Sequence, residues 1–251
     1  MSDALVYRRD EAGVSTLTLN RPDKLNSLNL AVFRELDRHV RDLANDPASI
    51  GCVIVRGAGR CFSAGHDLND LSLEDGDEDF AFESATVERL ANLPQAVISA
   101  VHGHCYTGAL ELALAGDIIL ASANARFADT HAKWALAPVW GMSQRLPRRV
   151  GFAKAREMMF TARTYSGAEA VSMGLANHCF ADERFYAEVQ EFAQSIVNNS
   201  RFSISTYKRL MAETDGLPLH AALSHEVHRY DGFGPDMSER VAAFANRKAE
   251  R

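Results

Sequence analysis

Two glycine-containing loops could hold a ligand with their backbone. The first, residues 63–67, reads Ser-Ala-Gly-His-Asp, and the second, residues 103–108, reads Gly-His-Cys-Tyr-Thr-Gly. Glycine lets a backbone approach a ligand without a Cβ in the way, and a helix N-terminus offers unpaired N–H donors with partial positive charge. Two such loops facing one point would form a hole for a developing oxyanion. On spacing alone, two purely structural strand-to-helix turns explain the loops equally well.

Glu111 is the residue best suited to moving a proton. It lies in the expected helix 109–115, which is apolar on all sides apart from this one carboxylate. A surface helix would show a whole polar face instead. Burial disfavours the charged carboxylate and raises its pKa, which suits a proton-transfer group working near neutral pH. The structural alternative is a glutamate paired with a distant cation.

The elements that must position these groups alternate between strand and helix up to about residue 180, as in an α/β fold. The pattern predicts strands over 14–20, 52–55, 96–101, 117–120, 126–128 and 175–180. It predicts helices over 29–45 with Asn29 as cap, 82–93, 109–115 and 168–173, and a helical remainder after Asp182. The acidic stretch 72–79 is expected to be a surface loop, and the loop at 62–68 to enter a short helix.

Composition excludes several classes of protein. The net charge is −6, from 27 basic and 33 acidic residues, and the closest basic cluster (Arg145, Arg148, Arg149) suits a solvated helix face, so no nucleic acid partner is expected. Residues 109–123 form the most apolar segment, but Glu111 and Asp117 interrupt it, so no membrane span is expected. The four cysteines lack C-x-x-C spacing, which favours reduced thiols in a cytoplasmic protein. No His, Cys or Asp spacing predicts a metal site.

Several ordered motifs resemble those of the enoyl-CoA hydratase/isomerase (crotonase) superfamily. Residues 62–68 (F-S-A-G-H-D-L) are similar to its motif F-[AS]-A-G-x-D-[LI]. Residues 101–118 are similar to its second signature, V-x-G-x-x-x-G-G-G-x-E-L-A-x-x-x-D-I. The likeness covers about residues 5–215. It implies a spiral of ββα units, with a core over 1–190 and a C-terminal helical trimerisation region over 191–251.

The resemblance also implies roles for individual residues. The backbone N–H groups of His66 and Gly108 would bind the thioester oxygen of an acyl-CoA. The substrate contacts that it implies are Lys24, Asn26, Ala64, Asp67, Leu68 and Asn69. Coenzyme A is part of the substrate, so no further cofactor is expected, and the assembly would be a homotrimer or a hexamer made of two trimers.

The chain departs from the family pattern at two places. The second loop reads Thr107-Gly108-Ala109, so only the central glycine of three remains. His131 occupies the position of a second glutamate with which family hydratases orient water and deliver a proton. His131 could form an unlike acid–base pair with Glu111, or it could only pack while Glu111 moves a proton alone. Asp129 is near in sequence but receives no role from the sequence.

The leading hypothesis is therefore a 2-enoyl-CoA hydratase, a lyase with Glu111 and His131 as catalytic residues. An enoyl-CoA double-bond isomerase is the nearest rival, a thioester hydrolase the third, and a catalytically inactive CoA-binding protein the alternative outside enzymes. Among the other histidines, His66 is of interest for its backbone, while His102 and His104 are expected to satisfy local backbone groups. Trp134 and Trp140 could line an acyl pocket or serve packing.

Overall fold

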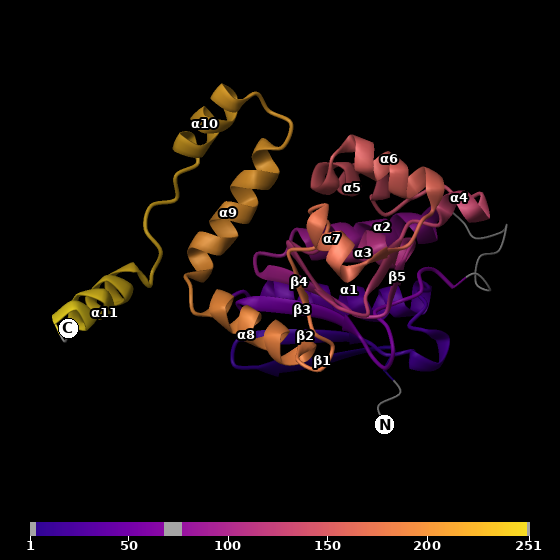
Figure 1. Cartoon of the computed structure of the whole chain (residues 1–251). Helices are drawn as coiled ribbons and strands as arrows, with labels where there is room; N and C mark the ends of the chain where they lie inside the picture. Colours follow the sequence, from indigo (N-terminus) through magenta and orange to yellow (C-terminus); the bar gives the residue numbers. More distant parts are fainter. Residues whose placement is uncertain (1–3, 68–76, 250–251) are drawn as a thin grey trace.

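A six-stranded sheet forms the centre of the computed structural model, which describes residues 4–67 and 77–249 (Figure 1). The strand order is β1-β2-β3-β4-β6-β9, with β1 antiparallel to β2 and the other neighbours parallel. The strands are β1 (Val6–Glu11), β2 (Val14–Leu19), β3 (Cys52–Gly57), β4 (Ala96–Val101), β6 (Ile118–Ser122) and β9 (His178–Phe180). β1 was not expected from the sequence, and β9 begins three residues later than the expected strand.

The sheet is buried on both faces at β3, as the continuous apolar run of this strand predicts. Val53 and Val55 face the core cluster that includes α1, while Cys52 and Ile54 face the cluster that includes α8. The Asn29 side chain accepts a hydrogen bond from the Val32 N–H and so caps α1 as expected. The helices on the two faces are α1 (Leu30–Asn45), α2 (Asp77–Ala91) and α8 (Phe185–Val197).

A second, three-stranded sheet brings together the segments that carry Gly108 and His131. It consists of β5 (His104–Tyr106), β7 (Arg126–Ala128) and β8 (Tyr165–Ser166), with β5 parallel to β7. The expectation of a plain loop over 103–108 was therefore wrong, because its middle pairs as β5. Since parallel neighbours end at the same edge of a sheet, Gly108 and His131 emerge side by side from β5 and β7.

Short helices follow these strands: α3 (Gly108–Ala113), α4 (His131–Trp134), α5 (Met142–Val150), α6 (Phe152–Thr161) and α7 (Gly167–Ser172). Of these, α4 and α6 were not expected, whereas α5 agrees with the helix face expected around Arg145, Arg148 and Arg149. Arg149 corrects the prediction of a solvated face on α5, because its guanidinium donates to the carbonyls of Leu175 and Gly116. α2 begins at Asp77, inside the acidic stretch expected as a loop, and residues 72–76 of that stretch lie outside the described residues.

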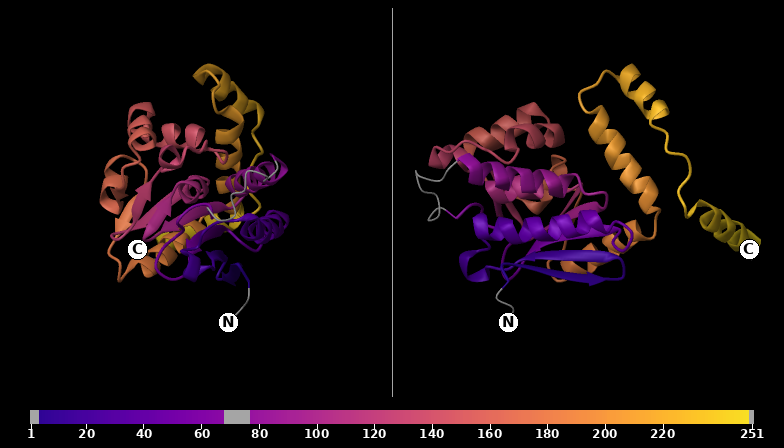
Figure 2. Two further views of the ribbon diagram at one scale, coloured as in Figure 1. Left: turned by 90° about the vertical axis from the view of Figure 1, so that its right-hand side faces the viewer. Right: turned by 180° about the vertical axis from the view of Figure 1, so that it is seen from behind.

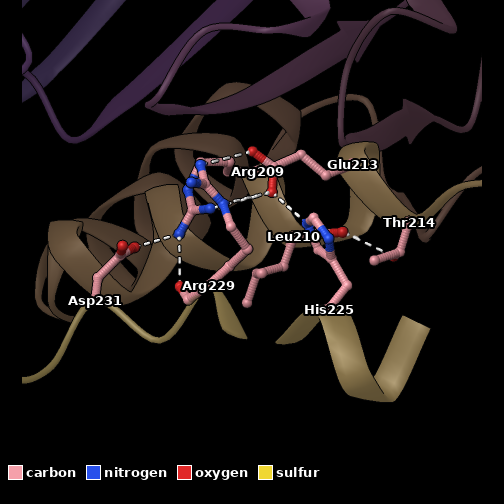
Figure 3. A network of polar contacts seen from close by, with 7 residues as sticks. All are labelled: Arg209, Leu210, Glu213, Thr214, His225, Arg229 and Asp231. Carbon is pink, nitrogen blue, oxygen red and sulfur yellow. Dashed lines mark hydrogen bonds and ion pairs between the residues drawn. The ribbon is translucent and has the colours of Figure 1, made fainter. Parts of the chain in front are cut away.

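The C-terminal helices lie beyond the core, and the first of them contacts it through the ion pair of Lys208 with Asp117 (Figures 1 and 2). They are α9 (Arg201–Thr214), α10 (Leu219–His228) and α11 (Met237–Ala249). Glu213 joins α9 to α10 by accepting from His225 (2.7 Å) and Arg229 (3.3 Å), as Figure 3 shows. α8 straddles the expected division between residues 190 and 191, and its Val189 and Ala193 belong to the core. Within 4–67 and 77–249, no helix combines the length and apolarity needed to cross a membrane.

Candidate active site

The loop over residues 62–67 is held between two other segments. On one side, the N–H groups of Phe62 and Ser63 donate to the carbonyls of His102 (2.7 Å) and His104 (2.9 Å). On the other side, Leu28 donates to the Gly65 carbonyl, and Asp67 donates to the Leu28 carbonyl, both at 2.8 Å. A loop bonded along both edges presents its backbone in one conformation, as an oxyanion hole requires.

Gly65 brings this loop against the start of α3. Its φ is +104°, and a Cβ at this position would lie 2.7 Å from the Tyr106 carbonyl oxygen and 3.7 Å from the Gly108 nitrogen. Only glycine permits this approach. Within the described part of the chain, no group accepts a hydrogen bond from the Gly108 N–H. The backbone segments that carry the two candidate oxyanion donors, the N–H groups of His66 and Gly108, therefore lie next to each other.

Thr107 has a backbone conformation that favours glycine. Its φ is +53° and its ψ is −114°, a region that costs a residue with a Cβ about 1–3 kcal/mol. Its hydroxyl bonds to the Thr130 hydroxyl and accepts a hydrogen bond from the Thr130 N–H at 3.1 Å. The replacement of a family glycine by Thr107 is thus more than a small change, because it links the loop before Gly108 to the loop before His131.

Replacing Thr107 with alanine is expected to lower the free energy of unfolding by about 1 kcal/mol, the typical contribution of one hydrogen bond. The Thr130 N–H loses its acceptor, while the strained backbone remains. Thr107→Ser keeps the hydroxyl and serves as the matched control, with a stability close to that of the wild type. Urea unfolding of the three proteins measures the difference, and equal losses in both variants would show that the hydroxyl link contributes nothing.

The Glu111 carboxylate is buried and is oriented by backbone donors. Its Oε1 atom accepts from the N–H groups of Trp140 (3.0 Å) and Met142 (2.9 Å), leaving Oε2 to face His131. Burial raises the pKa of Glu111, although the two N–H donors and the nearby His131 charge partly oppose the shift. The described partners of this carboxylate are two backbone N–H groups and the His131 imidazole, which is a cation when it is protonated.

His131 lies between two carboxylates. Its Nδ1 atom is 2.6 Å from Asp129 Oδ1, and its Nε2 atom is 3.6 Å from Glu111 Oε2. Because Asp129 accepts the Nδ1 proton, Nε2 is the atom that can take up or release a proton. Burial by itself lowers the pKa of His131, but the hydrogen bond to Asp129 and the charges of Asp129 and Glu111 outweigh it, so that the pKa is raised. The spacing Asp-x-His was the signal in the sequence for this contact.

Both raised pKa values predict that the folded protein loses stability as the pH rises. For His131, the stabilisation is fully present below its ordinary pKa of 6.5 and disappears as the pH passes the higher pKa of the folded state. For Glu111, the folded state gains stability as the pH falls through its raised pKa toward 4.5. The unfolding free energy of wild type relative to His131→Asn should therefore decline as the pH rises from the ordinary pKa of 6.5 through the raised pKa of His131. Urea titrations across this range measure it, and a constant difference would contradict it.

Among the other substrate-binding candidates, Lys24 and Ala64 are accessible to solvent, whereas the side chains of Asn26 and Asp67 are buried and hydrogen-bonded within the protein. Lys24 is exposed in the 3₁₀ turn η1 (Pro22–Lys24), and Ala64 is half-buried in the first loop. The Asn26 amide donates to the carbonyls of Ala58 and Cys61, both at 2.8 Å, so this side chain organises the loop. The Asp67 carboxylate likewise accepts from Arg21 and Ser27. Leu68 and Asn69 lie outside the described residues, as does the short helix expected after them.

Two further histidines, His102 and His104, and both tryptophans were candidates for local roles. His102 Nε2 bonds to the Gly59 carbonyl, as expected, whereas His104 Nδ1 bonds to the Tyr106 hydroxyl instead of the backbone. Trp134 is 56% exposed. Trp140 is buried, and its ring covers Gly108, where an added Cβ would lie 2.5 Å from the ring. Trp140 is thus the tryptophan that adjoins the candidate site.

Comparisons with known proteins agree along nearly the whole chain. The model of a family described as enoyl-CoA hydratase/isomerase matches residues 9–249. A probable peroxisomal enoyl-CoA hydratase of Arabidopsis thaliana is 33% identical, over 94% of this chain and 91% of the relative. A 1,2-epoxyphenylacetyl-CoA isomerase of Escherichia coli is 33% identical, over 95% and 94%. A crystal structure of an enoyl-CoA hydratase from Bacillus anthracis superposes with a TM-score of 0.92 at 30% identity, covering 97% of each chain.

Proposed function

Because the chain belongs to the enoyl-CoA hydratase/isomerase family, we propose that it catalyses the reversible addition of water to a 2-enoyl-CoA. The fold is that of the crotonase superfamily, and the chain is a hydratase-like enzyme that processes acyl-CoA substrates. The observation that carries the choice of hydration is the pair of proton-transfer atoms, Glu111 Oε2 and His131 Nε2, which lie 3.6 Å apart. A histidine held by Asp129 supplies the second acid–base group that the missing glutamate would have provided.

The proposed reaction divides the two proton transfers between these side chains. The Glu111 carboxylate takes a proton from water as its oxygen attacks C3 of the enoyl group. The His131 imidazolium, favoured by its raised pKa, gives a proton to C2 from Nε2. Glu111 is then protonated and His131 neutral, and one proton transfer across the gap of 3.6 Å restores both groups. In the reverse direction the same atoms exchange roles.

The enolate that forms between these steps carries its negative charge on the thioester oxygen. We assign the two donors to this oxygen as the backbone N–H groups of His66 and Gly108, supported by the contact between Gly65 and the start of α3. Lys24, Ala64 and the segment from Asp67 to Asn69 remain the proposed contacts of the coenzyme A moiety. The proposed chemistry needs no cofactor other than the coenzyme A that the substrate brings.

Double-bond isomerisation is the second candidate, and the name of the Escherichia coli relative favours it. Glu111 Oε2 could remove a proton from one carbon of the acyl chain and return it to another through the same enolate. The two reactions differ in whether water is incorporated.

Product analysis separates these reactions. The enzyme is incubated with crotonyl-CoA, a 3-enoyl-CoA or a 3-hydroxyacyl-CoA, and the products are identified by mass spectrometry. Hydration predicts conversion of crotonyl-CoA to a product heavier by one water, and dehydration of the 3-hydroxyacyl-CoA. Conversion of the 3-enoyl-CoA alone would replace the hydratase by the isomerase, and no conversion with retained binding would favour a CoA-binding protein.

We further propose that the chain forms homotrimers, or hexamers of two trimers, through its C-terminal helices. These helices expose large apolar side chains that a lone chain would leave in water, including Leu219 (75%), Val227 (74%) and Phe244 (67%). Native mass spectrometry of the wild type and of Leu219→Glu/Val227→Glu tests this, and a monomeric wild type would contradict it. A cytoplasmic location is also proposed, supported by four free cysteines, of which Cys52, Cys61 and Cys105 are buried.

A further inference from the structure

A further buried carboxylate, that of Glu83, lies beside the candidate site and has no role in the proposed reaction. Glu83 belongs to α2 and is only 2% exposed. Its Oε2 atom is buried and has no hydrogen-bond partner among the residues that the structure describes. A buried carboxylate oxygen without a partner is costly, and a protein keeps such a group chiefly where a ligand or a function requires it.

The protein neighbour of Glu83 is the side chain of His66. The His66 Nε2 atom lies 3.7 Å from Glu83 Oε1, which is longer than a hydrogen bond. The backbone N–H of His66 is the proposed oxyanion donor, so its side chain joins Glu83 to the place where the thioester is bound. Aromatic rings surround this imidazole: Trp140 at 5.5 Å and Phe80 at 6.4 Å between ring centroids.

Within residues 4–67 and 77–249, Trp140 carries a buried hydrogen-bond donor, its Nε1 atom, that lacks an acceptor, whereas Glu83 carries an acceptor that lacks a donor. The Trp140 ring covers Gly108 and packs edge-on against Phe33 at 4.7 Å. Two side chains that neighbour the His66 ring therefore have an unmatched acceptor, on Glu83, and an unmatched donor, on Trp140. A hydroxyl group can donate one hydrogen bond and accept another. An ammonium group could satisfy Glu83 but not Trp140.

From these contacts we propose that the acyl chain of the natural substrate carries a hydroxyl group beyond C3, which donates to Glu83 Oε2 and accepts from Trp140 Nε1. This inference rests on the proposed function in one respect, namely that the site binds an acyl-CoA. The hydroxyl lies beyond C3 because C3 itself is placed against Glu111 and His131. A site built to bond a hydroxyl rejects the analogue that lacks it, since its own polar groups would remain buried and unpaired.

Binding of saturated acyl-CoAs tests the proposal without any turnover. Calorimetric titration compares butanoyl-, hexanoyl- and octanoyl-CoA with 4-hydroxybutanoyl-, 6-hydroxyhexanoyl- and 8-hydroxyoctanoyl-CoA. The wild type is expected to bind at least one hydroxylated compound about tenfold or more tightly than its plain counterpart. Glu83→Leu should abolish this preference. Glu88→Gln, an exposed change on the same helix, should retain it.

The proposal is overturned if no hydroxylated compound binds more tightly to the wild type, or if Glu83→Leu keeps the preference. Thermal unfolding of Glu83→Leu distinguishes a ligand-binding role of Glu83 from a structural one. If Glu83 is an unpaired buried carboxylate, its loss should raise the melting temperature. If the fold needs Glu83 as a partner of His66, its loss should lower the melting temperature. Glu83→Gln provides a second variant of the same shape. A preference for the hydroxylated ligand in an enzyme that adds no water would leave this inference intact while refuting hydration.

Discussion

Glu111→Gln is expected to lower the rate of hydration by about a thousandfold or more, because general acid–base groups contribute about 10²–10⁴ in rate. The amide cannot take the proton of the attacking water. Its oxygen can still accept from the Trp140 and Met142 N–H groups, which now bond to Glu111 Oε1. The variant should therefore fold and bind acyl-CoA with an affinity close to that of the wild type. The loss should appear in kcat, as it does when an interaction with the transition state alone is removed.

The measurement combines initial rates with crotonyl-CoA and titration with butanoyl-CoA. Glu183→Gln, which changes an exposed glutamate, is the control and should behave like the wild type. Removing the buried acid should also increase resistance to urea at neutral pH, because burial raises the pKa of Glu111 and disfavours its charged form. A Glu111→Gln enzyme that still hydrates crotonyl-CoA at the wild-type rate would remove this residue from the mechanism.

The burial of Glu111 could be predicted because local pattern alone determined it. A helix with one acid among Ala and Leu residues must lie in the core, and the structure places it there with 1% exposure. The glycine and helix positions of the two loops only suggested an anion-binding role, and the resemblance to the family motifs was needed to make it the preferred hypothesis. The meeting of the two loops could not be predicted, because it depends on a single bridge between Ser63 and Cys105, too short a run for a strand pattern to be visible.

Contacts between distant segments were the other part that sequence reasoning could not supply. Thr107 and Thr130 meet only because they follow β5 and β7. The residues around each threonine give no indication that the two side chains are in contact. Glu83 is hidden for the same reason: α2 has a weakly patterned sequence, and the burial of this carboxylate comes from packing against residues around His66. Asp129 is intermediate, since its separation of two residues from His131 suggested proximity without showing the direction of either side chain.

His131→Ala is expected to lower hydration at least about tenfold, corresponding to about 1.4 kcal/mol in the barrier. The variant loses the group that gives a proton to C2, and it leaves Asp129 and Glu111 without the imidazolium that lay between them. His178→Ala, at an exposed histidine on β9, is the control. Rates for the variant equal to those of the wild type would return His131 to a packing role and favour proton transfer by Glu111 alone.

The pH profile of Asp129→Asn tests how His131 works. If the imidazolium is the proton donor, kcat falls at alkaline pH as His131 loses its proton. Asp129 raises the pKa of His131 through its hydrogen bond and its charge, so an uncharged asparagine should lower this pKa and move the alkaline limb of kcat to lower pH. The Asn side chain occupies nearly the same volume, so a purely structural role would leave the limb in place. An unmoved alkaline limb would therefore contradict His131 as the acid, even if the rate itself were reduced.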